Sequence, residues 1–150
     1  MRRFGDAREA GVRYRARPGA YGVILRGDRA LLALNDCPGD ELVLPGGGID
    51  PGETALQALH REAMEETGWR IRPLRRIGAY RRFAWMSEYG FHAEKICHVY
   101  LCAPIRRVAA PSEPDHHPVW VDAALAAETL SGAGDRALFR DAARATGISL

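Results

Sequence analysis

One helix with clear signals at both ends constrains the fold of this chain more than any other feature. Thr54 and Gln57 have the spacing of a capping box, in which each side chain accepts a hydrogen bond from a free backbone N–H of the first turn. Gly68 is typical of a helix end, because glycine readily adopts the left-handed conformation found there. These signals predict a helix over residues 55–67. Its core-facing stripe recurs at three- and four-residue intervals: Leu56, Leu59 and Ala63.

Strand-like segments precede and follow this helix. Apolar runs at 20–25 and 30–34 flank the turn residues Gly27 and Asp28 and predict a β-hairpin. A proline followed by three glycines at 45–48 predicts a loop with freedom for positive φ. Residues 71–105 mix apolar and polar residues as strands do. Further expected elements are strands at 41–44, 96–102 and 119–121, a hairpin tip at 87–90, a loop at 111–118 and two alanine-rich helices after Asp122. Mixed strands with helices between and after them indicate a layered α/β or α+β domain.

The length of 150 residues is typical of one domain. Residues 1–18 hold six arginines and little periodicity, so we interpret them as an N-terminal arm or an irregular edge segment, and residues 19–150 as a single domain. The chain has 21 basic and 19 acidic residues, and its net charge of +2 is too small to predict a nucleic-acid or membrane partner. Specific sites must therefore carry the function.

The cysteines and the apolar runs indicate a cytoplasmic protein. Of the three cysteines, Cys97 and Cys102 have odd spacing on one expected strand, so they would face opposite ways and could not pair. Reduced thiols are typical of the cytoplasm. No apolar run approaches the roughly 20 residues that span a bilayer, and the N-terminal sequence has no apolar signal core.

Three glutamates on the predicted helix are candidates for a metal site. Glu62, Glu65 and Glu66 share one sector of the helix surface, where like charges destabilise the helix by about a few tenths of a kcal/mol per pair. Such a cluster favours a compensating cation, and oxygen ligands select hard ions such as Mg²⁺ or Mn²⁺. The alternative is a solvated acidic face, in which Arg61 pairs with Glu65 one turn away.

The wider pattern decides between these interpretations. Residues 47–69 read GGIDPGETALQALHREAMEETGW, with Gly47, Glu53, Arg61 and the glutamates at fixed intervals before Gly68. This segment resembles the Nudix box, Gly-x5-Glu-x7-Arg-Glu-U-x-Glu-Glu-x-Gly-U, where U is a bulky aliphatic or aromatic residue. Every fixed position matches, and Ala63 is smaller than the usual residue at its position.

The resemblance implies a fold, a reaction and a set of site residues. The fold is an α/β/α sandwich with a mixed β-sheet, and the reaction is hydrolysis of a nucleoside diphosphate linked to another group. By position, the implied Mg²⁺ ligands are Glu62, Glu65, Glu66 and the carbonyl of Gly46. Glu53 and Arg61 would hold the loop and helix together, and Gly47 and Gly48 would let the backbone pass close to metal and phosphate.

The general base varies within the family. Glu65 is our first choice, because Glu62 and Glu66 are one turn apart and best placed to share a metal. Glu113, in the loop before the last strand, is the second choice, and Glu94 is the third. The neighbouring His116 and His117 are candidates for proton transfer or phosphate contact, but without a third ligand we expect them to be solvent-exposed.

Substrate contacts are predicted from an aromatic segment interleaved with arginines. Such residues can stack a base and bind a phosphate, and strand alternation should place half of them in the core. The candidates are Arg81, Arg82, Phe83 and Trp85.

The sequence thus predicts a Mg²⁺-dependent pyrophosphohydrolase for a small nucleotide, a dinucleoside polyphosphate or an ADP-ribose-like compound, with Mn²⁺ as a substitute ion. One alternative is a Nudix domain that binds a nucleotide without cleaving it. Another is an RNA 5′-end pyrophosphohydrolase that uses the arginine-rich arm. Because many relatives dimerise, the resemblance also leaves a homodimer open.

Overall fold

The protein folds around one mixed β-sheet in a computed structural model that describes residues 1–150. The strands are β1 (Arg2–Arg3), β2 (Tyr14–Arg26), β3 (Arg29–Asn35), β4 (Glu41–Val43), β5 (Gly46–Gly48), β6 (Trp69–Met86), β7 (Phe91–Arg107) and β8 (His116–Asp122). The helices are α1 (Ala55–Thr67), α2 (Ala123–Thr129) and α3 (Ala133–Ala145). The strand order is β1-β6-β7-β2-β3-β4, with β5 and β8 paired to β2 and β3. The pairs β1–β6 and β2–β7 are parallel and the others antiparallel.

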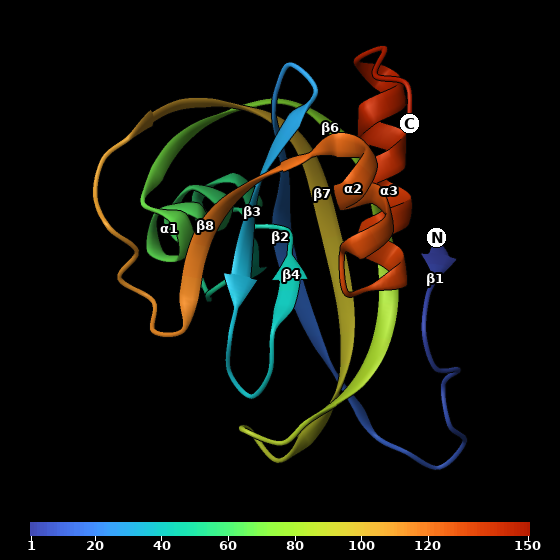
Figure 1. The fold of residues 1–150 in the computed structure, drawn as a ribbon. Coiled ribbons are helices and arrows are strands. Elements are labelled where there is room, and N and C mark those ends of the chain that lie inside the picture. The colour runs from blue at the N-terminus through green and yellow to red at the C-terminus, as the bar shows by residue number, and fades with distance from the viewer.

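Helices cover both faces of the sheet, which confirms the expected α/β/α sandwich. Figure 1 shows α1 on one side of the strands and α2 and α3 on the other. The core has two clusters accordingly, one including Leu59 of α1 and one including Phe139 of α3. Cys97 belongs to the second of these clusters and Cys102 to the first, and both thiols are free, so the two cysteines face opposite ways as predicted. None of the three helices is long and apolar enough to cross a membrane.

Helix α1 has the predicted bounds and caps. Thr54 and Gln57 form both hydrogen bonds of the capping box, and Gly68 adopts φ 73° at the C-terminal end. Leu59 and Ala63 are buried as expected, but Leu56 is 42% exposed. It lies in the first turn, and all the buried residues of the helix follow it in sequence, starting with Ala58. The prediction for Leu56 is therefore wrong.

The N-terminal residues are more regular than we predicted. Residues 2–3 form β1 beside β6, and β2 begins at Tyr14 rather than at residue 20. The reason is the length of β7, which pairs with β2 in parallel from Tyr14 to Ile24 and so extends it. The prediction of an irregular segment is therefore wrong for residues 2–3 and 14–18, which form strands.

The glycine run at 46–48 forms a short strand instead of the predicted loop. β5 pairs with residues 19–21 of β2, and the two backbones approach closely. A Cβ on Gly46, where φ is 149°, would lie 2.2 Å from the carbonyl oxygen of Ala20. The glycines therefore allow backbone packing. The hairpin turns at 27–28 and 87–90 are confirmed, whereas β8 begins at His116, inside the expected loop, because it pairs with β3 over seven positions.

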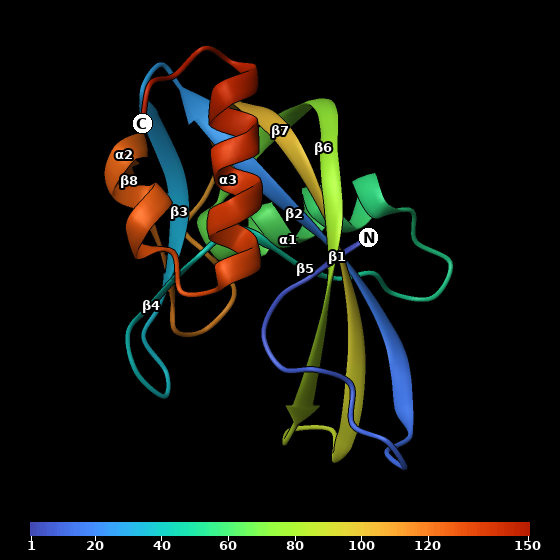
Figure 2. The ribbon, with the colours of Figure 1, turned by 90° about the vertical axis from the view of Figure 1, so that its right-hand side faces the viewer.

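The sheet divides beside α1. On the edge away from β7, β2 pairs with β5 at residues 19–21 and with β3 at residues 24–26. Figure 2 shows β2, β6 and β7 extending together away from β3 and β4. β5, which pairs with β2, lies next to the C-terminal half of α1, where the glutamates lie.

Candidate active site

Arg61 links α1 to the end of β5 and to the loop that follows it. Its Nε donates to Glu53 Oε2 at 2.8 Å, and its Nη2 donates to Glu53 Oε1 at 2.9 Å and to the carbonyl of Gly48 at 3.1 Å. Hydrogen bonds from Arg61 and from the backbone of Asp50 lower the pKa of Glu53 to about 2. The structure therefore brings Glu53 and Arg61 together, in the arrangement that would hold the loop and helix in place.

Glu66 is the most buried of the three helix glutamates. Its Oε1 accepts a hydrogen bond from the backbone N–H of Gly46 at 2.7 Å. Burial, together with the charges of Glu62, Glu113 and Glu65, raises the pKa of Glu66 to about 8.

Glu62 lies against the glycine strand. A Cβ on Gly47 would be 2.6 Å from Glu62 Cδ, so only glycine leaves room for this carboxyl group. Burial raises the pKa of Glu62 in spite of the hydrogen bond that Arg61 donates to its Oε1 at 3.0 Å. Glu65 is more exposed and lies 3.3 Å from Arg61 Nη1.

The donor set fits a hard divalent cation. The carboxylate oxygens of Glu62 and Glu66 are withdrawn from solvent beside a backbone free of side chains, and burial raises the pKa of both groups. No group of three or more Asp, Glu, His or Cys side chains converges closely enough here to hold a metal as it stands.

Glu113 lies near the site because its loop is hydrogen-bonded to the C-terminal end of α1. The amides of Ser112 and Glu113 donate to the carbonyl of Glu65 at 2.9 and 2.8 Å, and the amide of Val108 donates to the carbonyl of Gly68 at 2.8 Å. The charge of Glu113 contributes to the raised pKa of Glu66. Glu94, in contrast, pairs with Arg81 at 3.3 Å on the long β6–β7 hairpin.

His116 is a site residue that sequence reasoning placed in solvent. Its Nε2 lies 3.1 Å from Glu66 Oε2 and its side chain is 14% exposed. The Nδ1 of His116 is 3.0 Å from the carbonyl of Pro114, which can only accept, so Nδ1 carries the proton. The expectation of exposure is wrong for His116 and correct for His117, which pairs with Asp36, because neighbouring residues of a strand point to opposite faces.

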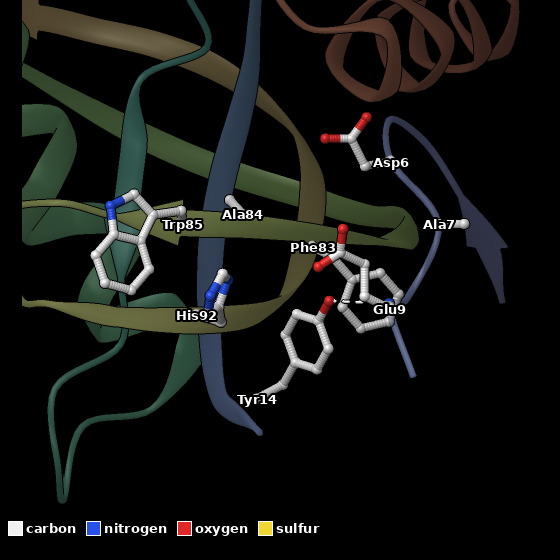
Figure 3. A pocket seen from close by; sticks show the side chains of 8 residues that line it. All are labelled: Asp6, Ala7, Glu9, Tyr14, Phe83, Ala84, Trp85 and His92. Carbon is white, nitrogen blue, oxygen red and sulfur yellow. Dashed lines mark hydrogen bonds between the residues drawn. The ribbon is translucent and has the colours of Figure 1, made fainter. Parts of the chain in front are cut away.

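The two aromatic residues predicted to contact the substrate, Phe83 and Trp85, lie together near the N-terminal segment. Phe83 packs on Tyr14 at 4.8 Å between ring centroids, and Trp85 is 57% exposed beside His92. Both line a cavity of about 180 Å³ bounded by the N-terminal segment, and none of its lining residues lies on α1 or β5 (Figure 3). The structure therefore does not bring these two aromatic residues together with the glutamates.

A second cavity, of about 160 Å³, borders the glycine strand. It is lined by Gly47 and Gly48 and by side chains that the sequence did not single out as site residues: Arg17, Tyr21 and Lys95. Burial raises the pKa of the Tyr21 hydroxyl. The sequence shows that Lys95 is the only lysine. The residues that lie beside it are set by the pairing of the strands, which the sequence did not predict.

A layered α/β fold with a mixed sheet is the class of structure that the Nudix box implied, and in it the glutamate-bearing helix lies beside the glycine strand. Comparison with protein families agrees, because the model of the NUDIX domain matches residues 15–142. The chain therefore belongs to the Nudix hydrolase family.

Three known proteins illustrate the similarity. The NUDIX hydrolase from Nitrosomonas europaea has a TM-score of 0.70 and 20% identity, covering 89% of this chain and 90% of that one. The MutT protein from Methanosarcina mazei Go1 has a TM-score of 0.69 and 22% identity, covering 91% and 99%. These two share the fold. A Bacillus subtilis (strain 168) protein named "Putative 8-oxo-dGTP diphosphatase" is 36% identical over 70 residues, or 47% of each chain, so the match spans about half of this curated relative.

Proposed function

We propose that the protein is a Mg²⁺-dependent pyrophosphohydrolase that cleaves a diphosphate linkage in a nucleoside diphosphate derivative, with Mn²⁺ as a substitute ion. The observation that supports this most is the burial of Glu62 and Glu66 beside Gly46 and Gly47, with the pKa of both carboxyl groups raised. Buried carboxylates are costly unless a cation compensates them, and a divalent ion does so.

Each site residue has a role in this proposal. Glu62, Glu66, Glu65 and the carbonyl of Gly46 would hold the ion, while Arg61 and Glu53 fix the loop and the helix relative to each other. When bound, the divalent ion neutralises phosphate charge and lowers the pKa of water. Glu65, which is partly exposed, accepts the proton of the attacking water, and Glu113 is the alternative base.

The substrate is a small nucleotide derivative. The name of the Bacillus subtilis relative makes 8-oxo-dGTP the first compound to test. Dinucleoside polyphosphates and ADP-ribose complete the panel, because the proposed chemistry needs only a diphosphate linkage. We place the reaction in the cytoplasm, consistent with three free thiols, and sedimentation would show whether the protein is a homodimer.

The decisive experiment compares two Glu→Gln variants. Glu66→Gln should lower turnover of the best substrate by at least about 10²-fold with the fold intact, because it weakens the metal site. Glu128→Gln, at an exposed position of α2, is the matched control and should retain normal rates. Near-normal turnover by Glu66→Gln would show that the ligand assignment is wrong.

Two rival functions give different results. A domain that only binds nucleotides would show heat of binding by calorimetry and no product from any compound at high enzyme concentration. An RNA 5′-end pyrophosphohydrolase would bind 5′-triphosphorylated RNA with an affinity that falls steeply with salt, because it releases counterions. A flat salt response would exclude the RNA function.

A further inference from the structure

Three cations lie side by side on three neighbouring strands. Arg17 of β2 is the register partner of Lys95 of β7, and Lys95 is the register partner of Arg82 of β6. Residues directly opposite each other on paired strands point to the same face of the sheet. We call Arg17, Lys95 and Arg82 the cation row.

No carboxylate forms an ion pair with the cation row. Like charges directly opposite each other destabilise a sheet. None of the three residues has a carboxylate within salt-bridge distance, whereas the adjacent Arg81 pairs with Glu94. Burial, and then the charges of Arg82 and Arg17, lower the pKa of Lys95, an effect that Glu88 partly opposes. A row with this unfavourable arrangement favours an anionic ligand.

Two members of the cation row, Arg17 and Lys95, lie next to the candidate active site, and Arg82 lies beyond Lys95 on the next strand. Arg17 and Lys95 line the cavity of about 160 Å³ that borders Gly47 and Gly48, and Glu88 is the only acidic residue in its lining. A Cβ on Gly48 would lie 3.3 Å from the guanidinium carbon of Arg17, and one on Gly47 would lie 2.6 Å from Glu62 Cδ. The glycine strand therefore separates the cations from the glutamates with no side chain of its own.

The guanidinium of Arg17 contacts Tyr89 at this cavity. Its carbon lies 5.1 Å from the centroid of the Tyr89 ring, and its Nη2 is 3.5 Å from the Tyr89 hydroxyl. A guanidinium over an aromatic ring can still donate its remaining N–H groups to phosphate oxygens. Lys95 supplies a compact charge beside it.

We propose that the cation row is a subsite for the part of the substrate's phosphate chain that extends beyond the cleaved linkage. This rests on the proposed function, in which the glutamates act on the linkage itself. The subsite favours nucleoside triphosphates and dinucleoside polyphosphates over ADP-ribose-like compounds, which have only the two phosphates of the linkage.

Binding of inorganic tripolyphosphate to the metal-free protein tests the subsite directly. Lys95→Met keeps the apolar part of the side chain and removes the charge, and Arg82→Gln removes a second charge. Each should weaken binding measured by calorimetry at low salt by about 10-fold or more, since a charge-assisted contact is lost. Arg72→Gln, on an exposed part of the same strand β6 as Arg82, is the control and should change the affinity by less than about twofold. Lys95→Met should also melt no lower than wild type, because it relieves like-charge repulsion.

The outcomes separate this subsite from the proposed reaction. Glu66→Gln should keep the affinity for tripolyphosphate while it loses hydrolysis. Wild-type protein that does not bind tripolyphosphate without metal, or a Lys95→Met variant that binds it as tightly as wild type, would overturn the subsite. A wild-type protein that shows the expected binding pattern but hydrolyses no nucleotide would refute the proposed reaction and leave the subsite standing.

Discussion

Alanine at position 47 should inactivate the site without unfolding the protein. The added Cβ would lie 2.6 Å from Glu62 Cδ, whereas ordinary contacts begin at 3.4 Å. The carboxyl group of Glu62 must therefore move by roughly 0.8 Å, the difference between these distances. Metal-ligand distances tolerate only about 0.2 Å, and a displacement near 1 Å in an active site costs on the order of 10²-fold in rate. We therefore expect Gly47→Ala to lower kcat by about 10²-fold.

Two other glycines separate this effect from a loss of stability. Gly47 does not have a positive φ, so its backbone accepts alanine. Gly46 has φ 149°, and a Cβ there would meet the carbonyl oxygen of Ala20, so Gly46→Ala should lower the melting temperature sharply. Gly39 has open space around its Cβ position and no positive φ, so Gly39→Ala should preserve both activity and stability.

The assay combines three measurements on each variant: turnover of the best substrate, Mn²⁺ affinity by calorimetry and thermal unfolding. For Gly47→Ala we expect slow turnover and weak Mn²⁺ binding with a melting temperature near that of wild type. The reasoning would be refuted if Gly47→Ala kept turnover within about threefold of wild type together with normal Mn²⁺ affinity, because Glu62 would then not be a ligand from its present position.

Two further variants test the residues around the glutamates. Glu53→Gln should destabilise the metal-free protein at pH 7. With the pKa of Glu53 lowered to about 2 by Arg61, this stabilisation is present above the ordinary value of 4.5 and is lost as pH falls from there towards 2. Urea unfolding should therefore show a smaller difference from wild type at about pH 3, and an equal difference at both pH values would contradict the ion pair. His116→Ala should weaken Mn²⁺ binding about 10-fold, because it removes the partner that orients Glu66, whereas His117→Ala should not. Equal effects of the two histidines would contradict this role.

The parts of the site that could be predicted depend on residues close together in sequence. The capping box of Thr54 and Gln57, the end of α1 at Gly68 and the common sector of the glutamates all follow from helix geometry over a few residues. The contact between Glu53 and Arg61 came from the family resemblance, and the structure places these two side chains together. The cores on the two sheet faces could also be anticipated, because alternation separates Cys97 from Cys102.

The same glycines show where local reasoning fails. A run of glycines permits unusual φ values, and we interpreted that freedom as a loop. In the structure the freedom serves a different purpose, since β5 pairs with β2 and approaches Ala20 more closely than any side chain would allow. Whether a glycine run turns or packs depends on a partner strand distant in sequence, which composition does not specify.

The residues that sequence reasoning missed are those whose neighbours are set by strand pairing. A period of two residues indicates which face a side chain occupies, but it does not indicate which strand lies alongside or in what register. Lys95 lies between Arg17 and Arg82 because β7 pairs with β2 on one side and with β6 on the other. The pairing of β8 with β3 places His116 beside Glu66. A local motif therefore specifies the groups that would bind the metal, whereas the groups that would select the substrate depend on the register of the sheet.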